Sequence, residues 1–174
     1  LQVWFHASII VAAMNAKSSD DIVALRRILK ENRVLAVVGL SAQWHRPSYF
    51  AAKYMLEHGY RVIPVNPQYK EVLGQKCYAS LRDIPEKVDL VDVFRKTADV
   101  MPVAEDAIAI GARVLWQQLG VCNDEAAARA RAAGLETVMD RCVKIEHGRL
   151  FGGLNWVGVN TRVISAKRPR WLAY

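Results

Sequence analysis

Residues 34–48 are VLAVVGLSAQWHRPS, and this stretch decides the fold. It begins with five apolar residues and a glycine, a pattern typical of a strand buried on both faces of a parallel sheet. Pro47 suits the first turn of a helix, and residues 49–58 have helical periodicity before Gly59. The stretch therefore predicts a strand, a connecting loop over residues 40–47 and a helix, which together make one unit of an α/β fold.

The same alternation continues on both sides of this unit. Further strands are predicted at residues 61–65, 88–94, 113–116 and 136–139. Helices are predicted from residue 22 to about residue 32, at 97–110 and at 123–133. Strands that alternate with helices of this length indicate βαβ units. We therefore predict an α/β fold: a single Rossmann-like domain with a mostly parallel five-stranded sheet and helices on both faces.

The 174 residues are expected to divide into three segments. Residues 1–17 form an N-terminal extension, and residues 1–13 are expected to be non-native sequence ahead of an initiator at Met14. Residues 18–150 form the Rossmann-like domain. Residues 151–174 form a basic C-terminal tail to which the sequence assigns no structure.

Composition and charge limit the classes of partner. With 52% hydrophobic and 24% charged residues the chain has a globular balance. The net charge is +7, but residues 148–174 contribute five basic and no acidic residues, so the remainder is close to neutral. Because a nucleic-acid footprint needs a basic face on the folded domain, we expect no nucleic-acid partner. The apolar run at residues 5–13 is about half of the roughly 20 residues that a membrane span needs, so no membrane association is expected.

The cysteines indicate neither a disulfide framework nor a metal site. Cys77, Cys122 and Cys142 are an odd number and form no CxxC pair. We therefore expect no metal and a cytoplasmic location.

The loop over residues 39–48 is the first candidate ligand site. In such sheets the ligand lies beyond the carboxyl ends of the strands, where the strand order reverses. Gly39 allows a tight turn, Ser41 and Ser48 supply hydroxyls, and Arg46 supplies a guanidinium suited to phosphate. A helix that begins here would present its free N–H groups to an anion. The loop lacks the G-x-G-x-x-G spacing, so an ordinary strand-to-helix turn remains the alternative.

The end of the second predicted strand distinguishes between nucleotide cofactors. Folds that bind NAD usually place Asp or Glu there to hold the ribose hydroxyls, whereas this chain has Asn66 followed by Pro67. The missing carboxylate argues against NAD and leaves room for a phosphorylated ribose. The basic residues available for such a phosphate are Lys53, Lys70, Arg95 and Lys96.

Catalytic candidates are few, and no catalytic residue is predicted. Cys142 and His147 could form an activated thiolate pair, or they are a core cysteine and a helix-terminal histidine. Asp92 is either a pocket residue or a structural carboxylate. Gln117 and Gln118 either offer amides to a ligand or pack beneath it.

Five segments taken in order carry a family resemblance. They are residues 37–49 (VVGLSAQWHRPSY), 59–67 (GYRVIPVNP), 88–95 (VDLVDVFR), 115–121 (LWQQLGV) and 139–147 (MDRCVKIEH). Together they resemble the small CoA-binding proteins, which are free-standing relatives of the N-terminal CoA-binding domain of the succinyl-CoA synthetase alpha subunit. The resemblance covers residues 22–150.

This resemblance implies that the chain binds coenzyme A or an acyl-CoA. It implies that the 39–48 loop contacts the phosphates, that Asn66 and Pro67 lie beside the adenosine end, and that Phe94 and Arg95 border the pantetheine or phosphate path. The full set of expected CoA-binding residues is Gly39, Leu40, Ser41, Arg46, Pro47, Ser48, Asn66, Pro67, Val93, Phe94, Arg95 and Lys96.

The resemblance does not extend to ligase chemistry. In the synthetase that chemistry relies on a phosphorylated histidine in a second domain and on a partner subunit, and the chain has no glycine-rich histidine loop to match. We therefore expect a stand-alone binding module without complete catalysis. The alternatives are an NADP-dependent oxidoreductase of Rossmann type and an acyl-CoA ligase component that needs a separate subunit.

Overall fold

The computed structural model describes residues 22–152, so the predictions for residues 1–17 and for the tail beyond residue 152 lie outside the described part. Five strands form an all-parallel sheet in the order β2-β1-β5-β6-β7. They are β1 (Val34–Val38), β2 (Arg61–Val65), β5 (Leu90–Val93), β6 (Val114–Gln117) and β7 (Glu136–Val138). The predicted α/β Rossmann-like architecture with a parallel five-stranded sheet is confirmed.

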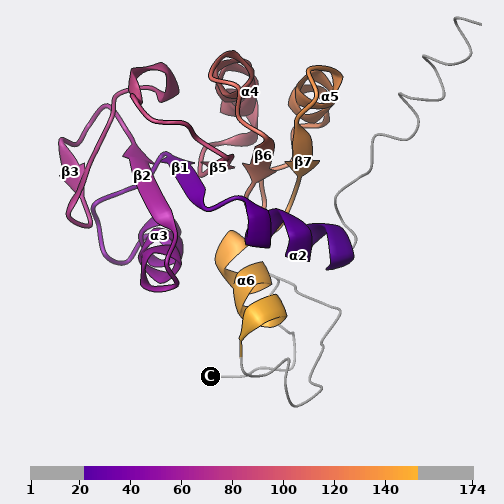
Figure 1. The fold of residues 1–174 in the computed structure, drawn as a ribbon. Coiled ribbons are helices and arrows are strands. Elements are labelled where there is room, and N and C mark those ends of the chain that lie inside the picture. The colour runs from indigo at the N-terminus through magenta and orange to yellow at the C-terminus, as the bar shows by residue number, and fades with distance from the viewer. Residues whose placement is uncertain (1–21, 153–174) are drawn as a thin grey trace, which may run out of the picture.

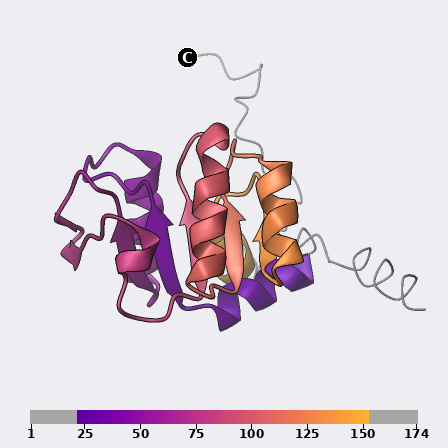
Figure 2. The same ribbon diagram turned by 90° about the horizontal axis from the view of Figure 1, so that it is seen from above.

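Helices cover both faces of this sheet (Figure 1). One face carries α2 (Ile22–Glu31), α3 (Pro47–Glu57) and α6 (Val143–Phe151). The other carries α4 (Val100–Ala109) and α5 (Asp124–Ala132), which lie side by side in Figure 2. The strand order reverses between β1 and β5. A ligand is therefore expected beyond the carboxyl ends of these two strands.

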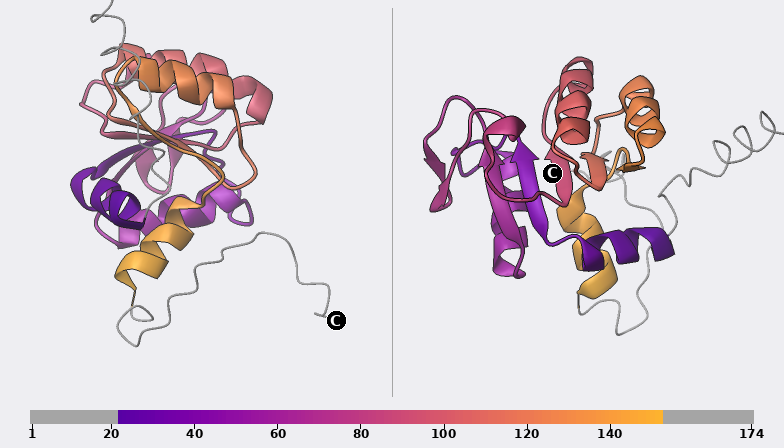
Figure 3. Two further views of the ribbon diagram at one scale, coloured as in Figure 1. Left: turned by 90° about the vertical axis from the view of Figure 1, so that its right-hand side faces the viewer. Right: turned by 45° about the horizontal axis from the view of Figure 1, so that its top comes forward.

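Alternation along each strand divides the core into two layers. In β1, Leu35 and Val37 pack toward α3 and α6, whereas Ala36 and Val38 pack toward α4 and α5. The buried apolar residues of the helices close each layer. Figure 3 shows the helices on the two sides of the sheet. The continuous apolar runs of the sequence are therefore strands buried on both faces.

Several elements differ from the sequence prediction. The helix predicted over residues 97–110 is a 3-10 turn, η2 (Thr97–Asp99), followed by α4. The turn-rich region after β2 contains a small antiparallel hairpin and a second 3-10 turn, which the sequence did not reveal. These elements are β3 (Glu71–Val72), β4 (Gln75–Lys76) and η1 (Leu81–Asp83).

Helix α6 was also missed. Its buried positions are Val143, Glu146, His147 and Leu150, which have helical spacing although two of them are polar. Among residues 22–152, no helix combines the length and the apolar character needed to cross a membrane.

Candidate functional site

Gly39 brings the ends of β1 and β5 together. Its φ is +85°, a left-handed conformation that favours glycine. Its N–H donates to the carbonyl oxygen of Val65 at 2.8 Å, and the N–H of Phe94 donates to the carbonyl oxygen of Val38 at 2.9 Å. A Cβ at Gly39 would overlap the carbonyl oxygen of Phe94. Glycine is therefore required both by the turn and by the close approach of the two chain segments.

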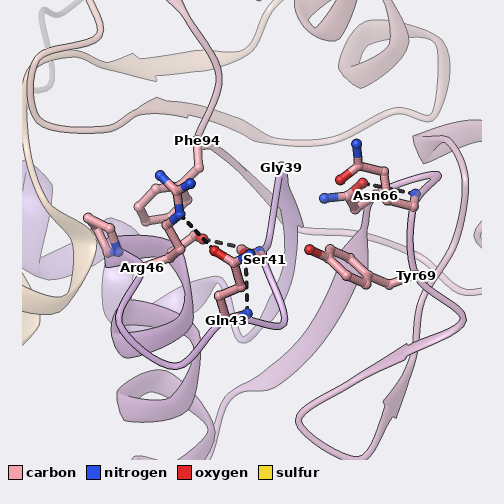
Figure 4. A pocket seen from close by; sticks show the side chains of 10 residues that line it. Gly39, Ser41, Gln43, Arg46, Asn66, Tyr69 and Phe94 are labelled. Atoms are coloured by element: carbon pink, nitrogen blue, oxygen red, sulfur yellow. Dashed lines mark hydrogen bonds between the residues drawn. The ribbon is translucent and has the colours of Figure 1, made fainter.

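The loop that follows is held by its own side chains (Figure 4). The N–H of Ser41 donates to Ser48 Oγ at 3.2 Å, and the N–H of Gln43 donates to Ser41 Oγ at 3.1 Å. Arg46 Nε donates to Gln43 Oε1 at 3.2 Å. Both serine oxygens accept from the backbone, and each hydroxyl still carries an O–H that can donate to an anion.

The N-terminus of α3 faces this loop. Pro47 occupies its first turn, as the sequence predicts, and the N-cap residue Arg46 makes no side-chain capping bond. The first turn carries no acidic residue. The positive end of the helix dipole and the Arg46 guanidinium therefore favour an anion at the same place.

Asn66 ties the end of β2 to the loop. Its Nδ2 donates to the carbonyl oxygen of Leu40 at 3.0 Å, and its Oδ1 accepts from the N–H of Gln68 at 3.0 Å. The side chain is buried. The position where NAD-binding folds carry a ribose-binding carboxylate is thus filled by an amide whose two ends are both bonded to the protein.

These groups enclose a pocket of about 360 Å³, within the range of small-molecule sites. It is lined by Gly39, Ser41, Gln43, Arg46, Pro47, Ser48, Asn66, Gln68, Tyr69 and Phe94. A second pocket of about 410 Å³ lies on the α4 side of the same strand ends and includes Pro67 and Arg95. The carboxyl ends of the strands therefore carry two neighbouring pockets, one on each side of the end of β1.

Most of the residues predicted from the sequence line one of these two pockets. Leu40 and Val93 line neither, because both are fully buried. Lys96 is exposed at the start of η2 and lines neither pocket. Gln43, Gln68 and Tyr69 line the first pocket but were not among the CoA-binding residues expected from the sequence. Gln43 lies within the 39–48 loop, and Gln68 and Tyr69 directly follow Asn66 and Pro67 at the carboxyl end of β2.

Asp92 lies beneath the site in the middle of the sheet. It is 1% exposed, and burial raises the pKa of its carboxyl to about 7, although the hydrogen bond from Gln118 opposes this shift. Gln118 Nε2 donates to Asp92 Oδ1 at 2.7 Å, and Gln117 exchanges two hydrogen bonds with the backbone of Asn123. The two glutamines therefore pack beneath the site, which decides between the two alternatives left by the sequence.

His147 has a different partner from the one that the sequence offered. Its Nδ1 lies 3.1 Å from the hydroxyl oxygen of Tyr54. Burial, together with the nearby His58 and Arg33, lowers the pKa of His147 to about 4. The hydrogen bond between the neutral His147 imidazole and Tyr54 joins α6 to α3. His147 therefore has a structural role here, in place of the activated pair with Cys142. Within residues 22–152, no group of three or more His, Cys, Asp and Glu side chains could hold a metal ion.

Comparison with known families identifies the family of the chain. The sequence model of a family described as "CoA binding domain" matches residues 33–148. The chain belongs to this CoA-binding domain family. The match includes every residue of the two pockets and confirms the resemblance seen in the sequence.

Two relatives cover the CoA-binding domain almost end to end. The uncharacterized protein YneT of Bacillus subtilis (strain 168) is 39% identical over 123 residues, which are 71% of this chain and 91% of that protein. A solved structure of a hypothetical protein from Pyrococcus horikoshii OT3 is 45% identical, with a TM-score of 0.75, and covers 78% of this chain and 97% of that one. Both proteins thus consist almost entirely of the part that they share with this chain.

A third relative is a much larger protein. The acetate–CoA ligase (ADP-forming) of Methanocaldococcus jannaschii is 29% identical over 72 residues, which are 41% of this chain. The CoA-binding domain matches only 10% of that ligase. The similarity therefore concerns one part of the ligase.

Proposed function

We propose that this protein binds coenzyme A, or an acyl-CoA, as a stand-alone module without complete catalytic machinery. The proposal is carried by the family match over residues 33–148, which includes the pocket in front of the N-terminus of α3. The similarity to a CoA ligase supports the same class of ligand. The family and the pocket chemistry agree, because coenzyme A is a phosphate-rich ligand.

The residues present fit such a ligand. The N-terminus of α3 has no capping side chain and no acidic residue in its first turn, so it can accept a phosphate without competition. Arg46, Ser41 and Ser48 would bind phosphate oxygens, while Asn66 and Pro67 would border the adenosine end. Coenzyme A supplies a terminal thiol that carries acyl groups, and the protein's own residues bind and orient it.

Arg95 lines the second pocket, together with Asp99 and Asp106. We assign Phe94 and Arg95 to the path of the pantetheine arm, between the two hollows. Leu40 and Val93 would then act through packing, because they hold the strand ends in place. Lys96 remains a proposed partner for an outlying phosphate.

The test is isothermal titration calorimetry of the protein, stripped of bound ligand, against CoA, acetyl-CoA, NAD and NADPH in one buffer. We expect CoA or acetyl-CoA to bind in preference to the dinucleotides. Arg46→Ala should weaken binding by about 1–3 kcal/mol if its guanidinium pairs with a phosphate. Arg113→Ala is the matched control. Arg113 is exposed and directly precedes β6, so it lies at the amino ends of the strands, away from the pocket. Binding of neither CoA nor acetyl-CoA would refute the proposal.

A second candidate is a component of an acyl-CoA ligase that works with a separate subunit. The observation that favours it is the similarity to the acetate–CoA ligase, of which the chain covers about a tenth. Affinity purification from the native host should then recover a nucleotide-binding subunit, and the pair should form acyl-CoA from acid, CoA and nucleotide.

An NADP-dependent oxidoreductase is the remaining alternative. The uncharged end of β2 at Asn66 leaves that alternative open, and NADPH in the titration series tests it. We also place the protein in the cytoplasm, because Cys77, Cys122 and Cys142 are free thiols, which a reducing compartment maintains.

A further inference from the structure

An aromatic groove lies next to the proposed CoA pocket and is built from α3, α6 and the loop that follows β1. Its volume is about 380 Å³, within the range of small-molecule sites. It is lined by Trp44, Tyr49, Phe50, Lys53, Tyr54, Glu57 and Lys144. Most of these residues lie on one side of α3, and Lys144 belongs to the first turn of α6, which contacts α3. None of them lines either pocket described above, so the groove is a separate site.

A β-turn separates the groove from the CoA pocket. Its end residues, Gln43 and Arg46, line the pocket, and the N–H of Arg46 donates to the carbonyl oxygen of Gln43 at 3.0 Å. Its central residue Trp44 lines the groove instead, and the ring centres of Trp44 and Phe50 are 6.5 Å apart. The carbonyl oxygen of Arg46 accepts from the N–H groups of Tyr49 and Phe50 at 3.0 and 3.3 Å, and both of these residues line the groove. The pocket and the groove therefore adjoin each other across one hydrogen-bonded turn.

The proposed orientation of coenzyme A directs its thiol end toward the groove. In Figure 4, Asn66 lies on one side of the pocket, and Arg46 and Phe94 lie on the other. The adenosine end is proposed to lie beside Asn66, and the pantetheine arm is proposed to pass Phe94. The arm therefore leaves the pocket on the side of Arg46, which closes the turn that carries Trp44. An acyl group at the end of the arm is thus directed toward the groove.

Two aromatic side chains of the groove are exposed to solvent. Trp44 is 71% exposed and Phe50 is 45% exposed, and their rings meet edge to face. Aromatic side chains offer a large apolar area, whose burial by a ligand is favourable. A standard protein interface needs roughly 20–30 residues on each side, far more than this groove supplies. A small apolar group is therefore the occupant that fits.

The charged residues of the groove leave it suited to an uncharged occupant. Lys53 Nζ lies 3.9 Å from Glu57 Oε1, so these two charges pair with each other. Lys144 Nζ lies 5.9 Å from the ring centre of Phe50 and 5.8 Å from that of Tyr54, within the range of cation–π contacts. The lysines thus have partners inside the groove, and its aromatic walls are what it offers to a ligand.

We propose that this groove binds the acyl group of an acyl-CoA whose phosphates occupy the neighbouring pocket, and that it prefers apolar acyl groups, aromatic ones most. This inference rests on the proposed CoA-binding function and names the class of acyl-CoA that the site selects. A flat ring can stack on, or meet edge to face, the rings of Trp44 and Phe50, whereas an acetyl group is too small to do so. The selection is made by binding alone, and no bond forms or breaks.

The experiment is isothermal titration calorimetry of the full chain, stripped of bound ligand, against CoA, acetyl-CoA, succinyl-CoA and benzoyl-CoA. We expect benzoyl-CoA to bind about tenfold more tightly than acetyl-CoA, because its ring is buried against two aromatic side chains. Succinyl-CoA, whose acyl group carries a carboxylate, should bind no more tightly than acetyl-CoA. The ratio of the benzoyl-CoA and acetyl-CoA affinities is the readout, so a general loss of CoA binding does not imitate the result.

Variants of the two exposed aromatic residues test the groove itself. Trp44→Ala and Phe50→Ala should each reduce the ratio to about two or less, and Trp44→Phe should keep part of it. Val23→Ala is the matched control, because Val23 is 72% exposed, as Trp44 is, but lies on α2 outside the groove. This control should keep the full ratio.

The outcomes separate this inference from the proposed function. A ratio near one in the wild type, or a ratio that persists in both alanine variants, would overturn the inference. An equal gain for succinyl-CoA would overturn it too, since charge and not the aromatic walls would then select the acyl group. If CoA and acetyl-CoA bind while the ratio is near one, the inference fails and the proposed function stands. If none of the four ligands binds, both fail.

Discussion

Replacing Gly39 by alanine tests whether the close contact between the ends of β1 and β5 requires glycine. Two costs add at this position. Alanine at a φ of +85° costs about 1–2 kcal/mol, because an L side chain clashes with the following carbonyl in the left-handed region. The new Cβ also overlaps the Phe94 carbonyl, and moving two strand ends apart costs about 1–3 kcal/mol, as overpacking does in cores. Gly39→Ala should therefore destabilise the fold by about 2–5 kcal/mol.

Gly74 supplies the matched control. It has a φ of +69°, but no atom lies within 4 Å of the position that its Cβ would occupy. Gly74→Ala should therefore cost only the conformational part, about 1–2 kcal/mol. The difference between the two variants isolates the close approach of β1 and β5.

The assay is urea denaturation, with the change in free energy taken from the midpoints at constant m. Calorimetry with CoA follows under conditions in which both variants are folded. Gly39→Ala should weaken CoA binding because it widens the crevice, and Gly74→Ala should leave it unchanged. Equal destabilisation by the two substitutions would refute the argument that Gly39 is needed for the contact with Phe94.

Three further predictions concern buried charge. Glu146 is 1% exposed and is bound by two arginines, so Glu146→Ala should cost about 3–5 kcal/mol in urea denaturation, whereas the exposed Glu57→Ala should cost less than about 1 kcal/mol. The pKa of His147 is lowered to about 4, so the unfolded chain binds a proton first as pH falls. The stability of the wild type relative to His147→Gln should therefore decrease by about 3 kcal/mol between pH 6.5 and 4. The pKa of Asp92 is raised to about 7, so the folded state keeps a proton that the unfolded chain releases. The stability that this proton contributes is lost as pH rises from about 4 to 7. Asp92→Asn should therefore be more stable than the wild type at pH 8 in thermal unfolding.

The sheet was predictable because its strands are apolar on both faces. The run over residues 34–38 has no polar residue to break it, and the other parallel strands carry at most one charged or polar interior position. Helix α6 was not predictable in the same way. Its inward positions include Glu146 and His147, which hydropathy counts as exposed, and only their partners Arg141, Arg149 and Tyr54 make their burial tolerable.

The site was predictable to the extent that it depends on residue type and chain order. The glycine, hydroxyls and guanidinium of the 39–48 loop are visible in the sequence, and parallel topology places them beside the end of β2. The sequence could not show that the Asn66 amide is hydrogen-bonded to the backbone of Leu40 and Gln68, because both hydrogen bonds depend on the folded backbone. It could not show the second pocket either, since that hollow forms between η1, η2 and α4.

The two faces of the sheet have different physical character, and this asymmetry bears on function. Around α4 and α5 the buried residues are mostly apolar, and the buried polar residues Gln117 and Thr137 are uncharged, so that layer contributes mainly packing. The face of α3 and α6 buries Asp92, Glu146 and His147 beside its apolar residues, at a cost in desolvation that hydrogen bonds and ion pairs only partly offset. Because Asp92 and His147 titrate in opposite senses, their effects on stability between pH 4 and 7 oppose each other, and a nearly flat wild-type profile should resolve into two opposite slopes in the single variants. The pocket proposed to bind coenzyme A lies beside this face, since Phe94 and the first residues of α3 line it.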